Sequence, residues 1–277
     1  MNMRHIVRSL LLTFNYLHPA ALAMAARRGP RATKRYLSEM YRCSKTDAGL
    51  YLPIVTLEEI APVPTEFVVS RPPDWGGSMT ITEISSLCHL VAARRPRKVL
   101  EIGSFRGLTT LNIAMNAADA ELHTLDLPPD ADPATTTFDT NDVNIITSRG
   151  GYFYESRPEA ARIFQHYGDT ATFDYKEIGG GVDFCLIDAA HSYDYVRNDT
   201  AKTLPLMSDG GVMLWHDYGR NDFLADPGDA WGVTRFLHEI ADAGVGILQG
   251  TSLGILLLNE EARAKLARHL RLPSGGK

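Results

Sequence analysis

Five predicted strands of this chain each end in, or next to, a carboxylate. The residues concerned are Glu101, Asp126, Asp169, Asp188 and the pair His216-Asp217. In open α/β sheets, ligands bind outside the carboxyl ends of the strands, near the point where the strand order reverses. A sheet does not need acids there for its own stability, and clustered titratable groups in a cleft are typical of functional sites. The pattern therefore predicts a binding or catalytic site, with a chance clustering of surface acids as the alternative.

The turn after the first of these strands discriminates between cofactors. A dinucleotide-binding turn would carry glycine at positions 103, 105 and 108. The chain instead has Gly103, Phe105 and Leu108, with its second glycine at Gly107. Because the bulky side chains do not suit the close approach of a pyrophosphate, a dinucleotide oxidoreductase is disfavoured. The two glycines could also do no more than form a tight turn between a strand and a helix.

A cofactor with a zwitterionic amino-acid tail suits this turn better. Backbone N–H groups at the start of the following helix can bind a carboxylate, and Glu101 or Asp188 could pair with an ammonium group. Asp126 lies 23 positions after Gly103, the usual place for a carboxylate that accepts both ribose hydroxyls. Asp169 would then be available to accept a hydrogen bond from an adenine amine. For Asp126, capping a strand end is the alternative.

The elements that would position these residues alternate between strands and helices. Apolar runs predict strands at 98–102, 121–126, 163–167, 182–188, 211–217, 245–249 and 254–258. Helical spacing predicts helices after an N-cap at Ser78 and at 108–116, 192–204 and 232–243. This alternation predicts an α/β, Rossmann-like fold with a mostly parallel sheet and helices on both faces. Only a tight turn separates the last two strands, so they must form a C-terminal antiparallel hairpin.

Size and composition favour one α/β domain with an N-terminal extension. Of the 277 residues, 71–277 are assigned to the domain, and 1–70 to an extension with helical patterning and then a proline-containing stretch. The extension has basic but no acidic residues before Glu39, so it could pack on the domain, mediate a homo-oligomer, contact a membrane surface or direct export. Asn15, His18 and Pro19 interrupt its apolar run, which disfavours export and a transmembrane helix.

Charge and cysteine content narrow the class of protein further. The formal net charge of −5 gives no reason to expect nucleic acid as a partner. The three cysteines have neither the spacing of zinc ligands nor the even count of a disulfide framework. A reducing, cytoplasmic location is therefore expected.

Three motifs carry a family resemblance that covers roughly residues 76–260. The run Glu101-Ile102-Gly103-Ser104-x-x-Gly107-Leu108-Thr109-Thr110 resembles motif I of class I S-adenosylmethionine-dependent methyltransferases. The segments 183–193 (DFCLIDAAHSY) and 209–218 (DGGVMLWHDY) resemble one branch of that class. This branch contains macrocin-type sugar O-methyltransferases, cephalosporin-hydroxylase-like proteins and, more distantly, catechol O-methyltransferases. The resemblance implies a seven-stranded sheet whose closing hairpin agrees with the one predicted here.

The resemblance also implies S-adenosylmethionine as the cofactor, and a set of residues that bind it. These residues are Glu101, Gly103, Ser104, Gly107, Thr109, Asp126, Asp169 and Thr170. In metal-dependent members of the branch, residues at the ends of two strands bind a divalent cation, and the matching positions are Asp188, His216 and Asp217. Family members commonly have a carboxylate where this chain has His216, and histidine is a poorer ligand for Mg²⁺. Mg²⁺, Mn²⁺ and no metal at all therefore stay open.

The implied reaction is methylation of a small hydroxyl-bearing acceptor, such as a sugar or a secondary metabolite. A cation would lower the pKa of the acceptor hydroxyl, and His191 or Asp188 would act as general base, although His191 could equally be structural. The segment 128–159, which includes Tyr152, Phe153 and Tyr154, is expected to form a lid or a surface loop. The alternatives are a hydroxylase-like or otherwise non-methylating member of the fold, and a non-catalytic scaffold that docks through its N-terminus.

Overall fold

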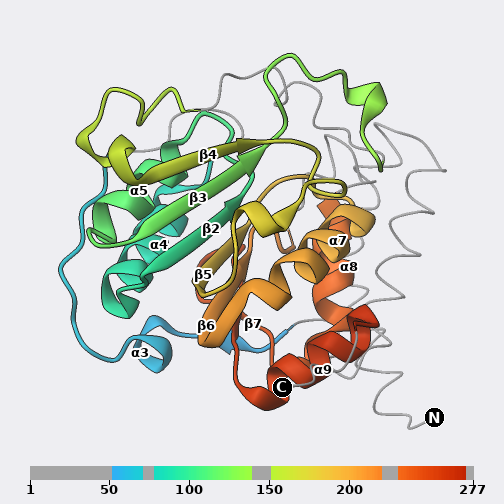
Figure 1. The fold of residues 1–277 in the computed structure, drawn as a ribbon. Helices are drawn as coiled ribbons and strands as arrows, with labels where there is room; N and C mark the ends of the chain where they lie inside the picture. The colour runs from blue at the N-terminus through green and yellow to red at the C-terminus, as the bar shows by residue number, and fades with distance from the viewer. Residues whose placement is uncertain (1–51, 71–77, 139–150, 220–229, 273–277) are drawn as a thin grey trace, which may run out of the picture.

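In the computed structural model, which describes residues 52–70, 78–138, 151–219 and 230–272, eight strands form one sheet (Figure 1). The strands are β1 (Ile54–Val55), β2 (Lys98–Ile102), β3 (Glu121–Asp126), β4 (Ile163–Tyr167), β5 (Val182–Ile187), β6 (Met207–Trp215), β7 (Gly246–Leu248) and β8 (Gly254–Leu257). Their order across the sheet is β1-β7-β8-β6-β5-β2-β3-β4. Within it β8 alone runs against its neighbours. The predicted mostly parallel sheet and the antiparallel β7–β8 hairpin are both confirmed.

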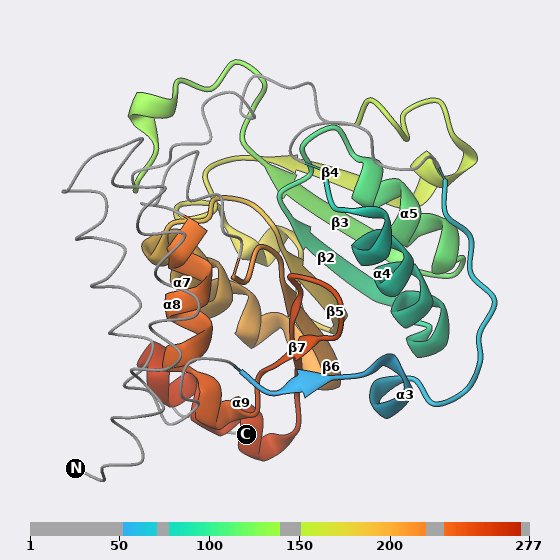
Figure 2. The same cartoon turned by 180° about the vertical axis from the view of Figure 1, so that it is seen from behind.

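Helices cover both faces of the sheet, as the alternation of elements predicts (Figure 2). One face packs against α4 (Ile81–Arg94) and α5 (Leu108–Asn116), while α3 (Leu57–Ile60) adds Ile60 to the same cluster of buried side chains. The other face packs against α7 (Tyr193–Thr203), α8 (Ala230–Glu239) and α9 (Glu260–Leu270). Because the central strands of the sheet are covered on both faces, β2 is buried from Val99 to Ile102, including the carboxylate-bearing Glu101.

The strand order reverses between β2 and β5. From β2 the chain proceeds outward to β3 and β4, whereas from β5 it proceeds in the opposite direction to β6. A crevice outside the carboxyl ends of two such strands is the general ligand site of open α/β sheets. The fold therefore places the ends of β2, β3, β5 and β6 around the site that the sequence predicts.

Two local features differ in detail from the sequence-based expectation. The N-cap of α4 is Thr80, not Ser78, and Thr80 and Glu83 form a reciprocal capping box. The sheet also has an eighth strand, β1, which comes from the region assigned to the N-terminal extension and pairs in parallel with β7. A strand of two residues is too short to produce a detectable alternation in sequence.

The segment expected to form a lid is fixed to the domain at both described ends. On one side, Thr137 donates from its backbone N and its Oγ1 to Oδ2 of Asp169, at 2.8 and 2.6 Å. On the other, Phe153 and Tyr154 are buried, while Tyr152 is 58% exposed. Residues 139–150, between these ends, lie outside the described part of the chain. Phe153 and Tyr154 thus pack against Leu108 and Leu111 of α5.

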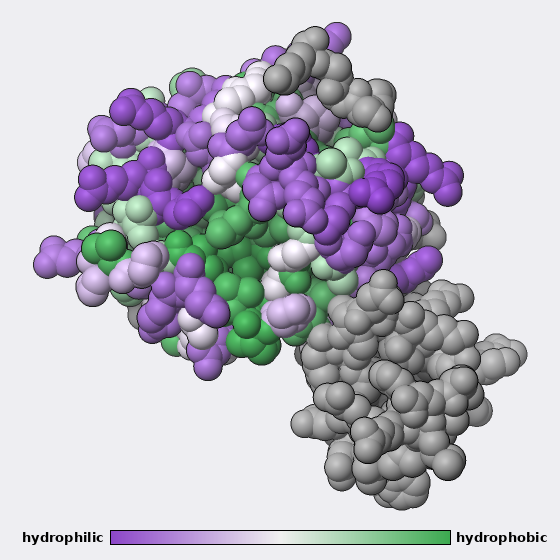
Figure 3. Space-filling view, turned by 90° about the horizontal axis from the view of Figure 1, so that it is seen from below, coloured by the Kyte–Doolittle hydropathy of each residue, from purple (hydrophilic) through white to green (hydrophobic). Residues whose placement is uncertain are grey.

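Residues 1–51, and with them most of the predicted extension, also lie outside the described residues. Among the helices that are described, none has the length and apolar character needed to cross a bilayer. The face seen from below exposes apolar side chains at its centre, surrounded by polar ones (Figure 3). Large apolar residues that are more than half exposed include Ile54 in β1 and Val63 shortly after α3, at 61% and 69%.

Candidate active site

Gly103 allows the ends of β2 and β5 to meet. Its φ is +99°, and a Cβ atom built on it would lie 2.2 Å from the carbonyl oxygen of Asp188. The backbone N of Gly103 donates to the carbonyl of Leu125, and that of Asp188 donates to the carbonyl of Ile102, both at 2.8 Å. Glycine alone combines this conformation with so close an approach. The predicted turn is therefore located at the reversal of strand order.

Asp126, the predicted ribose ligand, holds this turn in place. Its Oδ2 accepts from the backbone N of Ser104 and Phe105 at 3.1 and 2.7 Å, and its Oδ1 accepts from the backbone N of Leu127 at 2.8 Å. Burial raises the pKa of Asp126 to about 6 in spite of these hydrogen bonds. Phe105 itself adopts a φ of +47°, a conformation that costs a non-glycine residue energy and that the bond to Asp126 helps to maintain.

Glu101 is completely buried between the sheet and α5. Its Oε2 accepts from Oγ1 of Thr110 at 2.5 Å and from Oγ1 of Thr124 at 2.7 Å. Oε1 has no hydrogen-bond partner among the described residues. Burial raises the pKa of Glu101 to about 8, with the charges of Asp188 and Asp126 acting in the same direction. A buried oxygen without a partner is costly, so the Glu101 site is suited to a donor that a ligand would bring.

The hydroxyl of Ser104 is directed into the domain. Its Oγ lies 2.5 Å from Oγ1 of Thr124 and accepts from Nε2 of Gln165 at 3.2 Å, while the hydroxyl of Tyr154 donates to Oε1 of Gln165 at 2.6 Å. Tyr154 also packs against Gly107, where a Cβ atom would lie 2.5 Å from the tyrosine ring. Thr109, in the first turn of α5, is half-buried. Both the hydroxyl and the backbone N of Ser104 thus already have partners within the chain.

Asp169 and Thr170 lie at the end of β4, where the sequence predicts adenine contacts. The Oδ2 of Asp169 is bonded to Thr137, and its Oδ1 accepts from the hydroxyl of Tyr195 at 3.1 Å and from the backbone N of Ala171 at 2.9 Å. Burial opposes ionisation, but these bonds outweigh it and lower the pKa of Asp169. Thr170 is buried. Asp169 is thus ionised and half-buried, but already surrounded by donors from the chain.

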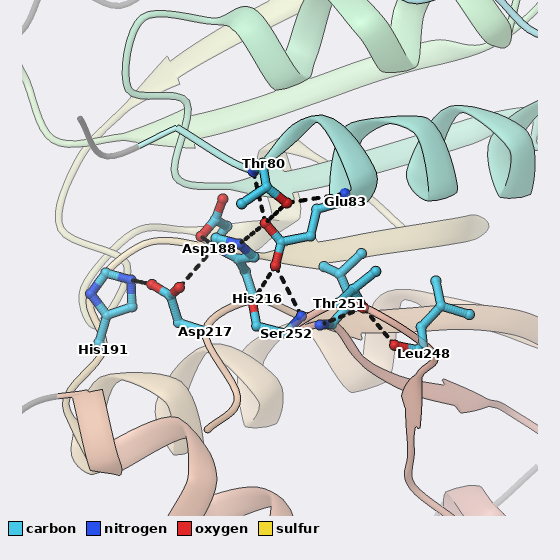
Figure 4. A network of polar contacts seen from close by, with 10 residues as sticks. Thr80, Glu83, Asp188, His191, His216, Asp217, Leu248, Thr251 and Ser252 are labelled. Carbon is cyan, nitrogen blue, oxygen red and sulfur yellow. Dashed lines mark hydrogen bonds and ion pairs between the residues drawn. The ribbon is translucent and has the colours of Figure 1, made fainter. Parts of the chain in front are cut away.

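Three potential metal ligands converge at the ends of β5 and β6. Asp188, His191 and Asp217 each offer a ligand atom, and these atoms all lie within 4.8 Å of one another. The Nε2 of His191 lies 2.7 Å from Oδ2 of Asp217 (Figure 4). Asp217 is 3% exposed and has a φ of +68°, in the left-handed region that Asp and Asn tolerate better than most residues. Two carboxylates and an imidazole are a donor set suited to Mn²⁺ and other transition ions.

His216 is not in this group, although the sequence places it among the metal ligands. Its Nδ1 lies 2.8 Å from Oδ1 of Asp188 and 3.4 Å from Oδ1 of Asp217, and its Nε2 lies 3.5 Å from Oε2 of Glu83 (Figure 4). Burial opposes protonation, but the carboxylates of Asp188, Glu83 and Asp217 outweigh it and hold the pKa of His216 well above its usual range. His216 therefore lies between the carboxylates of Asp188 and Glu83, outside the group of three potential ligands.

Glu83 carries the matching negative charge. Its burial opposes ionisation, but contacts with His216, Ser252 and Thr80 outweigh it and hold the pKa of this carboxyl well below its usual range. Sequence reasoning did not identify Glu83 as a site residue. The only signal was the Thr-x-x-Glu spacing of a capping box, which accounts for a helix start and says nothing about a contact with β6.

Gly232 is a second residue that the sequence did not single out. A Cβ atom built on it would lie 2.1 Å from the carbonyl oxygen of His191 and 2.3 Å from the backbone N of Tyr193. Helix α8 therefore packs directly on the backbone that carries His191. The sequence places Gly232 at the start of the predicted helix 232–243 and does not show which backbone this residue approaches.

Comparisons with known proteins agree with this geometry. Residues 100–218 match the family described as a methyltransferase domain. No curated protein sequence gives a significant match. The matched segment begins within β2, contains the Gly103 turn, and ends just after Asp217.

Several solved structures are also similar to the chain. They include the SAH-bound methyltransferase PaMTH1 of Podospora anserina (17% identity, covering 69% of this chain and 83% of that one, TM-score 0.48). TomG of Streptomyces achromogenes, an O-methyltransferase of tomaymycin synthesis in complex with SAM, is 19% identical over 66% of this chain and 82% of its own, with a TM-score of 0.47. An O-methyltransferase of Bacillus cereus in complex with SAH is 19% identical over 65% and 81%, with a TM-score of 0.43.

The family match covers the Gly103 turn, the end of β3 and the ends of β5 and β6, which together form the carboxyl edge of the sheet around the reversal of strand order. Over residues 100–218 the chain is therefore similar to a methyltransferase domain.

Proposed function

We propose that the chain is a class I methyltransferase, which transfers the methyl group of S-adenosylmethionine to a hydroxyl oxygen of a small acceptor. The observation that supports an oxygen acceptor is the cluster of Asp188, His191 and Asp217 beside the Gly103 turn. Such a cluster can hold a cation or accept a proton, and either activates a hydroxyl. Methyl transfer otherwise needs mainly that the two reacting atoms be held close and in line.

Along the carboxyl edge of the sheet, different residues are assigned to the tail, the ribose and the adenine of the cofactor. The N-terminus of α5, where Gly107 is the N-cap, offers backbone N–H groups to the carboxylate of the methionine tail. Oε1 of Glu101 faces no donor among the described residues and suits the ammonium group of that tail. Asp126 is assigned to the ribose hydroxyls, and Asp169 with Thr170 to the adenine side. Oδ2 of Asp169 would share its bonds between Thr137 and the base.

The donor set of Asp188, His191 and Asp217 fits a divalent cation, with Mn²⁺ a better match than Mg²⁺ because of the imidazole. Such an ion would lower the pKa of the acceptor hydroxyl. The chain contributes the geometry. Asp217 orients the ring of His191 through their 2.7 Å contact, and His216 holds Oδ1 of Asp188 at 2.8 Å. Without an ion, the same His191–Asp217 pair is arranged as a general base and its orienting carboxylate.

The branch of the methyltransferase class indicates which kind of acceptor to expect. The motifs at 183–193 and 209–218 resemble the macrocin-type branch, which supports a sugar or a secondary-metabolite hydroxyl as the acceptor.

We assign the N-terminal extension, 1–70, to packing against the domain or a second copy of the chain. Light scattering of the full chain and of a version lacking residues 1–36 tests whether this segment contacts a second copy. An unchanged number of chains per particle would exclude a role of the segment in oligomerisation.

Calorimetric titration tests the cofactor site. S-adenosylhomocysteine is expected to bind the wild type, and to bind Asp126→Asn at least tenfold more weakly, because loss of a hydrogen bond to a charged group costs about 1.5–3 kcal/mol. Asp119→Asn, a change at an exposed residue after α5, is the matched control. Absence of binding to the wild type, or equal affinities in all three proteins, would refute the proposed cofactor site.

Chelation separates the two roles of His191. With a panel of hydroxylated acceptors, turnover that disappears on exhaustive chelation and returns with Mn²⁺ assigns His191 to the ion. Turnover that persists after chelation but is lost in His191→Gln assigns it to proton transfer. Persistence in both cases contradicts the role of His191 altogether.

A further inference from the structure

We propose that Glu83 is a positioning residue of the candidate active site, which acts on the carboxylate of Asp188 through the imidazole of His216. The proposal rests on the proposed function, because it assigns to Glu83 the orientation of a carboxylate that serves the reaction. Glu83 lies on α4, and His216 follows β6 (Figure 4). The contact therefore joins the helical layer to the carboxyl edge of the sheet.

The carboxylate of Glu83 is held from two sides. Its Oε2 accepts from the backbone N and Oγ1 of Thr80, both at 2.8 Å. Its Oε1 accepts from the backbone N and Oγ of Ser252, in the turn between β7 and β8, at 2.9 and 2.6 Å. Glu83 is 5% exposed. Four hydrogen bonds from two elements fix this group in one orientation.

A capping role does not account for this arrangement. The chain has a second capping box, formed by Thr56 and Glu59 at the start of α3, in which Oε2 of Glu59 accepts from the backbone N of Thr56 at 2.7 Å. Glu59 is exposed. Glu83 makes the same cap bonds but is in addition buried, bonded to Ser252 and paired with His216. The pairing with His216 connects Glu83 to Asp188, which a helix cap does not require.

The ring of His216 transmits the orientation. Its Nε2 lies 3.5 Å from Oε2 of Glu83, and its Nδ1 lies 2.8 Å from Oδ1 of Asp188. A ring with a carboxylate at each nitrogen has one preferred rotation about its Cβ–Cγ bond, because a half-turn would replace both nitrogens by carbons. Outer partners of this kind orient groups that contact a ligand or a metal. Glu83 thereby determines which edge of the imidazole faces Asp188.

The test measures Mn²⁺ binding to the apo-protein, and S-adenosylhomocysteine binding as an internal control. Glu83→Gln is expected to weaken Mn²⁺ binding by about 10- to 100-fold, the usual effect of losing an outer partner of a metal ligand, with little change in S-adenosylhomocysteine affinity. Glu59→Gln, which removes the charge from the other capping box, is the matched control and should leave both affinities unchanged. Ser252→Ala releases one side of Glu83 while keeping its charge, and should weaken Mn²⁺ binding in the same direction but less.

The outcomes separate this proposal from the proposed function. Mn²⁺ affinities of Glu83→Gln and Glu59→Gln that agree within twofold overturn the role of Glu83, as does an equal loss of both ligands in Glu83→Gln. If Glu83→Gln does not fold, Ser252→Ala decides, and a wild-type affinity overturns the role. If the wild type binds no Mn²⁺, the metal part of the proposed function fails. The role of Glu83 is then judged by ¹⁵N-histidine NMR, where the Nε2–H signal of His216 should broaden by solvent exchange in Glu83→Gln but persist in Glu59→Gln. Its persistence in both overturns the proposal.

Discussion

Replacement of Glu101 by glutamine should change how the stability of the apo-protein depends on pH. Glu101 is fully buried, and its pKa rises from 4.5 to about 8 on folding. In the unfolded chain the carboxyl loses its proton near pH 4.5, whereas in the folded protein it keeps the proton until about pH 8. The group therefore destabilises the folded state progressively as the pH rises between these values, and its contribution is most favourable below pH 4.5.

The size of the effect follows from the same two pKa values. Each unit of pKa difference corresponds to about 1.4 kcal/mol, so the contribution of Glu101 to the free energy of unfolding should fall by about 3 kcal/mol between pH 5 and pH 7.5. Glutamine has the same shape, can accept from Thr110 and Thr124, and does not titrate. The difference between Glu101→Gln and the wild type should thus increase in favour of the variant by about that amount.

Urea unfolding followed by far-UV circular dichroism at half-unit steps from pH 5 to pH 8 measures this difference. Subtraction of the two curves removes the contributions of the other titrating groups, including Asp199, whose buried carboxyl also has a raised pKa of about 7. A difference that stays constant across this range would refute the reasoning, since Glu101 would then be ionised in the folded protein. A difference that decreases with pH would reverse the sign of its contribution.

Four further substitutions test the geometry of the site. Placing an alanine in the left-handed region costs about 1–2 kcal/mol. Gly103→Ala should lower the free energy of unfolding by more than that, because its Cβ would lie 2.2 Å from the carbonyl oxygen of Asp188. Thermal unfolding measures the change, and a decrease below about 1 kcal/mol contradicts the prediction. Gly232→Ala should displace His191 and weaken Mn²⁺ binding while S-adenosylhomocysteine binding persists, and equal Mn²⁺ affinities by calorimetry would show that the α8 contact is not required. Asp217→Asn should abolish Mn²⁺ binding while the backbone conformation is kept, since Asn tolerates its φ of +68°; retained Mn²⁺ binding would remove Asp217 from the site. Tyr154→Phe should lower the free energy of unfolding by about 1–3 kcal/mol, because Oε1 of Gln165 loses its 2.6 Å donor, and an unchanged urea midpoint would contradict this.

Much of the fold follows from the sequence because its strands are short apolar runs with clear ends. The strand Lys98–Ile102 was predicted with its observed bounds, and the tight link between β7 and β8 required an antiparallel pair. The start of α4 was misplaced by two residues, since Ser78 and Thr80 are both acceptable caps. What decides between them is the buried position of Glu83, which depends on contacts with Ser252, 169 positions further along the chain.

The site was predictable as a set of residues at strand ends, but not as a set of contacts. Parallel strands bring their carboxyl ends to one edge, so Asp126, Asp188 and Asp217 were expected there. His191 contacts Asp217, whereas His216 lies between the carboxylates of Asp188 and Glu83. These contacts depend on the direction of each side chain, which the sequence spacing of the two histidines does not reveal. His216 and Asp217 both lie beyond the end of β6, and here His216 points toward α4 while Asp217 points toward His191 (Figure 4).

The two-residue strand β1 determines how far the N-terminus can be shortened without exposing an edge of the sheet. The backbone N of Ile247 donates to the carbonyl of Pro53 at 2.7 Å, and that of Gln249 donates to the carbonyl of Val55 at 2.9 Å. These bonds cover the outer side of β7, which would otherwise offer unpaired amides to a strand of another molecule. A truncated protein that begins after residue 52 would expose the outer edge of β7 and would aggregate more readily through strand addition. A protein that begins before Leu52 keeps this edge covered.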